Sequence, residues 1–189
     1  MHPIRLMLAA ALLAVAAFPA HAGDDILDAI DQGRKAYQAG DLGGAKQQLD
    51  LASQLIGQKN AEAFVTLLPD PLPGWKAEKA QAQSVGAALL GASSATREYT
   101  NSKGENVQIS ITGDSAMIMQ FGPMMANPAL AAAMGKLIRI GPVRGIQNQQ
   151  GDVMLLVHNK FMINVTGSAD AASKLAYAKA IDVGKLSKM

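Results

Sequence analysis

The stretch between Asp114 and Lys136 contains no ionisable side chain, and it constrains the fold more than any other part of the sequence. Five of the ten methionines lie within it, at Met117, Met119, Met124, Met125 and Met134. A segment without charge must either be buried beneath the rest of the chain or be a surface on which another molecule docks. We predict that most of these Met side chains are buried and that a minority forms an exposed apolar patch.

This stretch has the length of a membrane span, which needs about 20 predominantly apolar residues. However, Gly122-Pro123 and Asn127-Pro128 interrupt it, and a proline ends or kinks a helix. We therefore predict two short apolar helices. The first covers Ala116–Phe121, and the second begins at Pro128, with Asn127 as its N-cap, and ends near Gly135.

Residues 1–22 have the three parts of an export signal. Arg5 supplies the positive charge, Leu6–Phe18 is the apolar core, and Ala20-His21-Ala22 is an A-x-A cleavage site. The apolar run is too short to be a stable membrane anchor. We expect a mature chain that starts at Gly23, lies in the periplasm and has no transmembrane segment.

The charge balance excludes some partners. The chain has 17 Lys and Arg against 15 Asp and Glu, whereas a nucleic-acid-binding protein needs a clustered basic footprint. No polybasic patch for anionic lipid is evident either. Cysteine is absent, so the fold has to be stabilised by packing rather than by disulfides.

Residues 23–68 form a predicted helical hairpin region. Its first helix has apolar residues at helical spacing, and Asp24, Asp25 and Asp28 favour the positive end of its dipole. Gly40-Asp41 ends that helix. The second helix, up to Ile56, has its apolar residues on one face, namely Leu42, Ala45, Leu49, Ala52, Leu55 and Ile56. A third helical piece, Ala61–Leu68, is predicted to begin after Asn60 as its cap.

The hairpin resembles one tetratricopeptide repeat. The matching positions are Gly33, Gly40-Asp41, Ala45, Leu49 and Ala52. The resemblance implies two helices that approach closely at small residues and turn at Gly-Asp. Two alternatives remain open for this segment: a helical hairpin that packs on its own domain, and a repeat that binds a peptide.

The sequence P-D-P-L-P-G at residues 69–74 is the clearest boundary in the chain, because each proline removes a backbone donor and stiffens the chain. We interpret it as a linker between the helical region and a domain at residues 75–189. Trp75, the only tryptophan, follows at once and is predicted to be a core anchor.

The hydrophobic period changes to two after Trp75. Val107, Ile109 and Ile111 alternate with polar residues, which indicates a strand with one buried face. A last helix, Ala169–Val183, is predicted to expose Lys174, Lys179 and Asp182. Strands are predicted at Trp75–Gln83, Thr96–Thr100, Asn106–Thr112, Leu137–Ile140, Val143–Asn148, Asp152–Val157 and Phe161–Thr166. The predicted fold class is α+β, an antiparallel sheet with a short helical insertion and a terminal helix.

This succession of elements resembles the fold pattern of the PsbP and Mog1 families. The segments "LLPDPLPGW", "REYT", "DSAMIMQF" and "NPALAAAMGK" resemble a family of exported bacterial proteins that pair a helical hairpin with such a domain. The resemblance implies the compartment and the layout, and it implies no activity.

Few side chains for catalysis are present. Once residues 1–22 are removed, His158 is the only histidine, and its H-N-K turn predicts a solvated loop residue. No zinc-binding or nucleophilic cysteine exists, and no phosphate-binding glycine motif occurs. The aspartates at the start of the first helix complement its dipole, although carboxylates are also ligands for Ca²⁺. We predict no enzymatic activity and no cofactor.

Two functions are consistent with these features. The first is binding of another periplasmic or envelope protein, through the helical hairpin or through a surface formed by Met117, Met119, Phe121, Met124 and Met125. The second is carriage of a small ligand such as Cu(I), because thioether sulfur is a soft ligand. The candidate copper ligands are Met117, Met119, Met124 and Met125.

Overall fold

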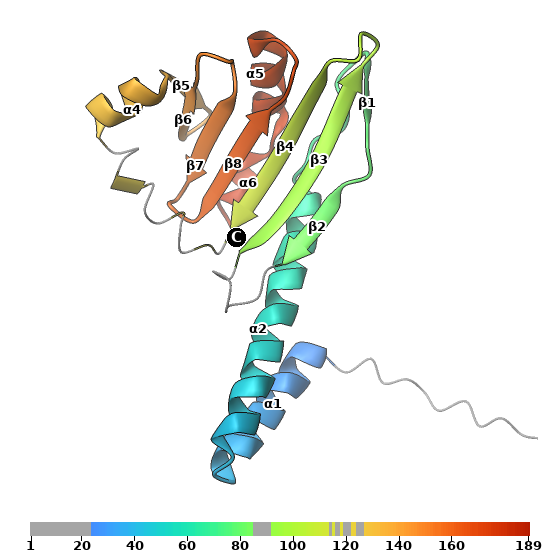
Figure 1. Ribbon diagram of the computed structural model, residues 1–189, viewed down its shortest axis with the longest axis vertical. Coiled ribbons are helices and arrows are strands. Elements are labelled where there is room, and N and C mark those ends of the chain that lie inside the picture. The colour runs from blue at the N-terminus through green and yellow to red at the C-terminus, as the bar shows by residue number, and fades with distance from the viewer. Residues whose placement is uncertain (1–23, 85–91, 114, 116–117, 119–121, 124–126) are drawn as a thin grey trace, which may run out of the picture.

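The computed structural model describes residues 24–84, 92–113, 115, 118, 122–123 and 127–189. The predicted export signal lies outside the described residues. The fold is α+β, as predicted, with a pair of helices at the N-terminal end, an antiparallel sheet and helices at the C-terminal end (Figure 1).

Two antiparallel helices form the N-terminal hairpin. Helix α1 (Asp25–Gln38) begins at Asp24, whose carboxylate accepts a hydrogen bond from the Ile26 amide. Helix α2 (Leu42–Val65) begins at Asp41, whose carboxylate accepts one from the Gly44 amide at 2.8 Å. Gly40, with a φ of 80°, makes the turn between them.

The prediction of a separate third helix is wrong, because α2 continues without a break through Gly57 and Asn60. The reason is packing. At Gly57 the helix crosses strands β2 (Gln81–Ser84) and β3 (Ser93–Asn101), and an added Cβ would lie 2.4 Å from Ser84 Oγ. The glycine therefore permits a close helix–sheet contact, and this outweighs its cost of about 1 kcal/mol in a helix.

Within the described residues the sheet has eight strands, all paired antiparallel. Their order is β1-β3-β4-β8-β7-β6-β5, and β2 also pairs with β3. The predicted strand at Trp75–Gln83 is thus two short strands on one edge. The strands not yet located are β1 (Trp75–Ala77), β4 (Asn106–Gly113), β5 (Lys136–Ile140), β6 (Val143–Gln147), β7 (Val153–Val157) and β8 (Phe161–Thr166).

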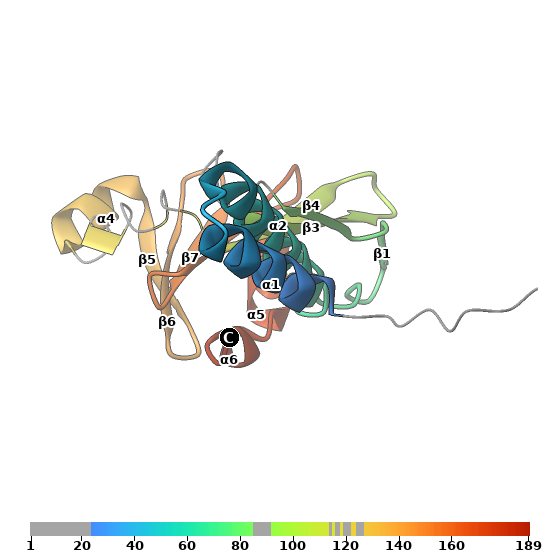
Figure 2. The same cartoon turned by 90° about the horizontal axis from the view of Figure 1, so that it is seen from below.

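One face of the sheet forms the core. Val107, Ile109 and Ile111 of β4 point into it and are fully buried, which confirms the predicted register. The end of α2, helix α5 (Ala171–Ala180) and helix α6 (Val183–Leu186) cover this face, and α5 and α6 lie behind the sheet in Figure 1 and at the lower side of the view in Figure 2. The core therefore includes residues from both sides of the Pro-rich segment.

The Pro-rich segment is fixed to this core by three aromatic residues. The Tyr99 hydroxyl donates to the Pro69 carbonyl at 2.7 Å, and the Leu72 amide donates to the Tyr177 hydroxyl at 3.2 Å. Trp75 packs edge-on against Tyr177, as expected for a core anchor, with ring centroids 5.3 Å apart. Burial raises the pKa of Tyr99 to about 12, although the neighbouring Arg97 opposes the shift.

Lys174 was predicted to face solvent, and this is wrong. Its side chain lies on the buried face of α5 with Tyr177 and Ala178, at the i, i+3 and i+4 positions of one helix face. Its ammonium donates to Asp152 Oδ1 at 2.7 Å and to the Gln150 carbonyl at 2.8 Å. A buried lysine needs such partners. Because these partners are more than 20 residues away in the sequence, the local pattern around Lys174 does not predict its burial.

Candidate interaction surface

The five residues predicted as a partner surface, Met117, Met119, Phe121, Met124 and Met125, lie outside the described residues. Around them, the predicted second helix is confirmed as α4 (Pro128–Met134), with the Asn127 side chain accepting from the amides of Ala129 and Leu130. Ile118 and Ala131 are buried, whereas Leu130 is exposed. The charge-free stretch thus contains both core and surface residues.

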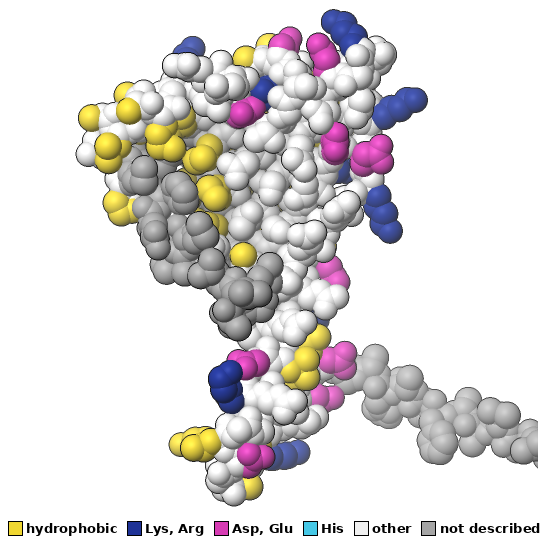
Figure 3. Space-filling model, viewed as in Figure 1, with side chains coloured by type: hydrophobic (Ala, Val, Ile, Leu, Met, Phe, Trp, Pro, Cys, Tyr) yellow, Lys and Arg dark blue, Asp and Glu magenta, His cyan; other side chains and the backbone are white. Residues whose placement is uncertain are grey.

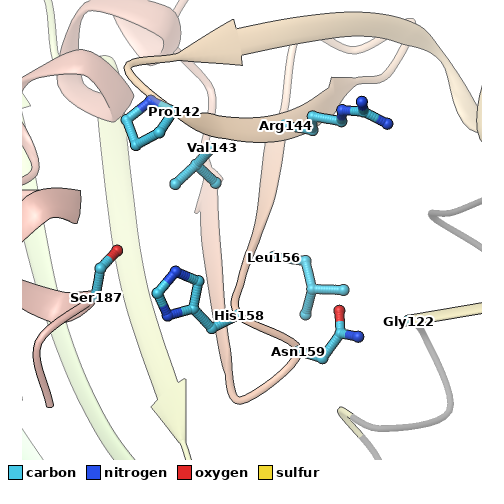
Figure 4. Close-up of a pocket in the computed structure, with 8 residues that line it drawn as sticks. All are labelled: Gly122, Pro142, Val143, Arg144, Leu156, His158, Asn159 and Ser187. Atoms are coloured by element: carbon cyan, nitrogen blue, oxygen red, sulfur yellow. The ribbon is translucent and has the colours of Figure 1, made fainter.

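A cavity of about 300 Å³ lies beside the β7–β8 turn (Figure 4). His158 and Asn159 line it from two successive left-handed positions, and His158 is exposed, as predicted. The Arg144 guanidinium points away from the His158 ring, and the Ser187 hydroxyl donates to the Val183 carbonyl at 2.8 Å. No carboxylate is among the described residues that line this cavity. The hydroxyl proton of Ser187 is directed to a backbone carbonyl.

A second cavity, of about 230 Å³, contains two thioethers, those of Met134 and Met154. Asp152 also lines it, but its two carboxylate oxygens already accept hydrogen bonds from Lys174 and Asn148. Across the part of the chain that the structure describes, no three His, Asp or Glu side chains gather as metal ligands do. The candidate copper ligands lie outside that part.

Exposed apolar residues concentrate on the hairpin instead. Ten large hydrophobic residues are exposed among the described residues, and seven of them belong to α1 and α2. Single exposed apolar residues are normal, but a gathering on one element is not. These seven are Leu27, Ile30, Tyr37, Leu42, Leu49, Leu51 and Ile56.

The reason for this exposure is the seam between the two helices, which is made of small residues. Ala29, Gly33, Ala45 and Ala52 are buried there. An added Cβ on Gly33 would lie 3.2 Å from Leu49 Cγ and 3.4 Å from the Ala45 carbonyl. This is the close approach that the tetratricopeptide resemblance implied. Small side chains fill the seam, and the partly exposed Leu49 packs against its edge at Gly33.

Six of the seven exposed residues share one side of the hairpin. Leu42, Leu49 and Ile56 are seven residues apart on α2, and Leu27, Ile30 and Tyr37 follow one stripe of α1. Each stripe is displaced from its seam in the same rotational sense, so the antiparallel helices present both stripes on one side. We name this set the hairpin face: Leu27, Ile30, Tyr37, Leu42, Leu49 and Ile56. Leu51 lies about 200° around α2 from Leu49 and faces the other side.

The charges of α1 are unevenly distributed along its length. Four aspartates lie at its N-terminal end, Asp24, Asp25, Asp28 and Asp31, and Arg34 and Lys35 follow in its second half. Arg34 pairs with Asp31 at 3.1 Å in a solvent-exposed ion pair, which contributes little to stability. α1 is therefore acidic at its start and basic towards its end.

The hairpin projects away from the sheet (Figure 1). In Figure 3 it forms a narrow extension with hydrophobic side chains on its visible surface, and a second gathering of hydrophobic side chains lies at the α4 end of the molecule. None of the helices within the described residues combines the length and the apolarity needed to cross a bilayer.

No family model, curated protein or solved structure matches the chain. The predicted resemblances to exported and PsbP/Mog1-like proteins thus stay predictions. Sequence reasoning identified the apolar residues of the hairpin but left open whether they pack on their own domain. The signal that could have settled this is the small size of the seam residues Ala29, Gly33, Ala45 and Ala52.

Proposed function

We propose that this chain is an exported, non-enzymatic protein that acts through protein–protein contact, and that the hairpin face is its binding surface. One observation carries the proposal. Six large apolar side chains, between 39% and 68% exposed, lie together on one side of a projecting hairpin.

The energetics favour contact with a protein. Burying a large apolar side chain fully is worth about 1.5–3 kcal/mol, so covering six half-exposed ones provides several kcal/mol for association. The hairpin stays attached to the sheet domain because α2 continues into the core at Phe64.

The two cavities support a non-enzymatic function less directly. At the His158 cavity the Ser187 hydroxyl donates to the Val183 carbonyl, and at the second cavity the Asp152 carboxylate is held by Lys174 and Asn148. The α4 end of the molecule, with Leu130 and Leu137 exposed, offers a second apolar surface.

Photo-crosslinking in intact cells tests the proposal. A photoreactive amino acid at Leu27 should form a covalent adduct with any protein that covers the hairpin face, and the same amino acid at Lys179, exposed on α5, is the control. We expect an adduct at Leu27 that the control lacks. If Leu27 gives no adduct, the hairpin face is not a binding surface.

The compartment needs a separate measurement. The intact mass of protein from a periplasmic extract should correspond to a chain that starts at Gly23. A mass that corresponds to the chain with residues 1–22 still attached would contradict export with cleavage.

A further inference from the structure

We infer that Arg139 and Arg144 form a binding site for a phosphate monoester, carried either by a small solute or by a lipid headgroup. The two residues lie on strands β5 and β6, at one edge of the sheet. This site shares no residue with the hairpin face, so the inference does not depend on the proposed function.

The register of the sheet places the two arginines side by side. Arg139 and Arg144 are direct cross-strand partners, so their side chains leave the same face of the sheet with Cβ atoms about 5 Å apart. Both residues are exposed. Like charges directly opposite each other destabilise a pair of strands. The arrangement is therefore unfavourable unless an anion lies between the two guanidinium groups.

No carboxylate compensates this pair in the part of the chain that the structure describes. Among those residues, neither guanidinium forms an ion pair. In the sequence, no acidic residue occurs between Asp114 and Asp152, a stretch that contains both arginines and Lys136. Asp152 itself is paired with the buried Lys174. The two arginines thus lie in a region of one sign of charge.

Protection of the sheet edge does not explain the pair. Charged side chains on an edge strand discourage pairing with another chain, and Arg139 occupies such a strand, because β5 is the last strand of the sheet within the described residues. Arg144 does not, because β6 lies between β5 and β7. It adds a positive charge where edge protection needs none.

Two guanidinium groups suit a phosphate better than a carboxylate. Each guanidinium presents a planar fork of N–H donors that can bind two oxygens of one anion at once. One fork is enough for a carboxylate. Two forks on the same face match the several acceptor oxygens of a phosphate monoester, whose charge at neutral pH is about −1.5 to −2.

The cavity beside Arg144 provides room for the group that carries the phosphate. Its volume is about 300 Å³. Val143 and Leu156 supply apolar contact there, and His158 and Asn159 supply groups for hydrogen bonds (Figure 4). No carboxylate that would repel a phosphate is among the described residues that line it. A phosphate held by the arginines thus has a small cavity next to it for its organic substituent.

Isothermal titration calorimetry of the purified protein with glycerol 3-phosphate tests the site. We expect saturable binding, which Arg139→Gln/Arg144→Gln should weaken at least about tenfold. Arg139→Lys/Arg144→Lys keeps both charges but loses the forks, so it should weaken binding as well. Lys76→Gln/Lys179→Gln is the matched control and should bind like the wild type, because it removes the same charge from exposed positions on β1, at the other edge of the sheet, and on α5.

Thermal unfolding gives a second measurement. In low salt without phosphate, Arg139→Gln should raise the melting temperature, because it removes the contact between like charges. Inorganic phosphate should raise the melting temperature of the wild type but not that of Arg139→Gln/Arg144→Gln. A melting temperature lowered by Arg139→Gln would show that the pair is already compensated, which overturns the inference.

Vesicle sedimentation distinguishes the two sources of the phosphate. If the wild type, but not Arg139→Gln/Arg144→Gln, sediments with vesicles of phosphatidylcholine and phosphatidic acid and not with phosphatidylcholine alone, the phosphate is that of a lipid headgroup. Binding of glycerol 3-phosphate without such sedimentation assigns the site to a solute. Binding of neither probe, or binding that the Gln variant retains in full, overturns the inference. The crosslink at Leu27 tests the proposed function separately from all of these results.

Discussion

The buried ion pair between Lys174 and Asp152 gives the sharpest test of the fold, because its two members differ in burial. The Lys174 side chain is 3% exposed, and the Asp152 side chain is 29% exposed. Lys174 donates to Asp152 and to the Gln150 carbonyl, whereas Asp152 also accepts from Asn148 Nδ2 at 3.2 Å. Removing Asp152 therefore leaves a buried ammonium, whereas removing Lys174 leaves a partly exposed carboxylate.

Asp152→Ala leaves an ammonium buried with a single backbone carbonyl. An uncompensated buried charge of this kind costs about 3–5 kcal/mol. Lys174→Met leaves a carboxylate that keeps water and Asn148 as partners, so we expect a smaller cost of about 1–2 kcal/mol. The double variant should cost less than the two single variants added together, because the residues interact directly.

The ion pair also makes the free energy of unfolding depend on pH in the acidic range. Desolvation raises the pKa of Asp152, but the hydrogen bonds from Lys174 and Asn148 and the Lys174 charge outweigh it and lower that pKa below 3.8. A carboxylate whose pKa is lowered by folding contributes stability above its unfolded pKa of about 3.9 and loses it as the pH falls through the folded value. Wild-type stability should therefore decline in this acidic range, and Asp152→Ala should lack this part of the decline.

Urea denaturation followed by Trp75 fluorescence and circular dichroism measures these differences. Equal costs for the two single variants would refute the burial argument. A larger cost for Lys174→Met would refute it as well. An acid decline unchanged in Asp152→Ala would show that the pair does not lower the pKa of Asp152.

Three further predictions concern the core. Phe64→Ala should lower the free energy of unfolding by about 3–5 kcal/mol in urea denaturation, because the fully buried ring packs edge-on against Phe161. A change near zero would mean that the end of α2 does not pack in the core. Ile109→Ala should cost about 2–5 kcal/mol while Ser110→Ala changes little, and the reverse order would mean that β4 is shifted by one residue. In a spectrophotometric titration Tyr99 should ionise near its raised pKa of about 12, so its contribution to stability should be lost between about pH 10 and that value; a tyrosine signal complete well below that pH would contradict its burial.

Local patterns predicted the elements that depend on neighbours in sequence. The alternation at Val107, Ile109 and Ile111 predicted the buried face of β4, and Asn127-Pro128 predicted the start of α4. Both signals act within a few residues, because a strand alternates with period two and an N-cap bonds to the first turn.

Contacts between distant segments determined what could not be predicted. Gly57 is a helix breaker in isolation, yet α2 continues through it because the sheet needs a residue without Cβ there. A lysine on a helix is expected to face solvent, yet Lys174 is buried because it forms an ion pair with Asp152. The hairpin face belongs to the same class, since helical spacing shows which residues share a side but not what covers it.

The exposure of the hairpin face follows from the way in which the hairpin is attached to the sheet domain. Short helices are marginal on their own, and a seam of alanine and glycine buries little apolar surface. If the hairpin had to be stable by itself, its large residues would belong in the seam, where Ala29, Gly33, Ala45 and Ala52 lie instead. Helix α2 removes that need, because its last turns are anchored in the sheet core through Phe64. The large apolar residues are thereby left exposed on one side of the hairpin, where a partner protein would bury them.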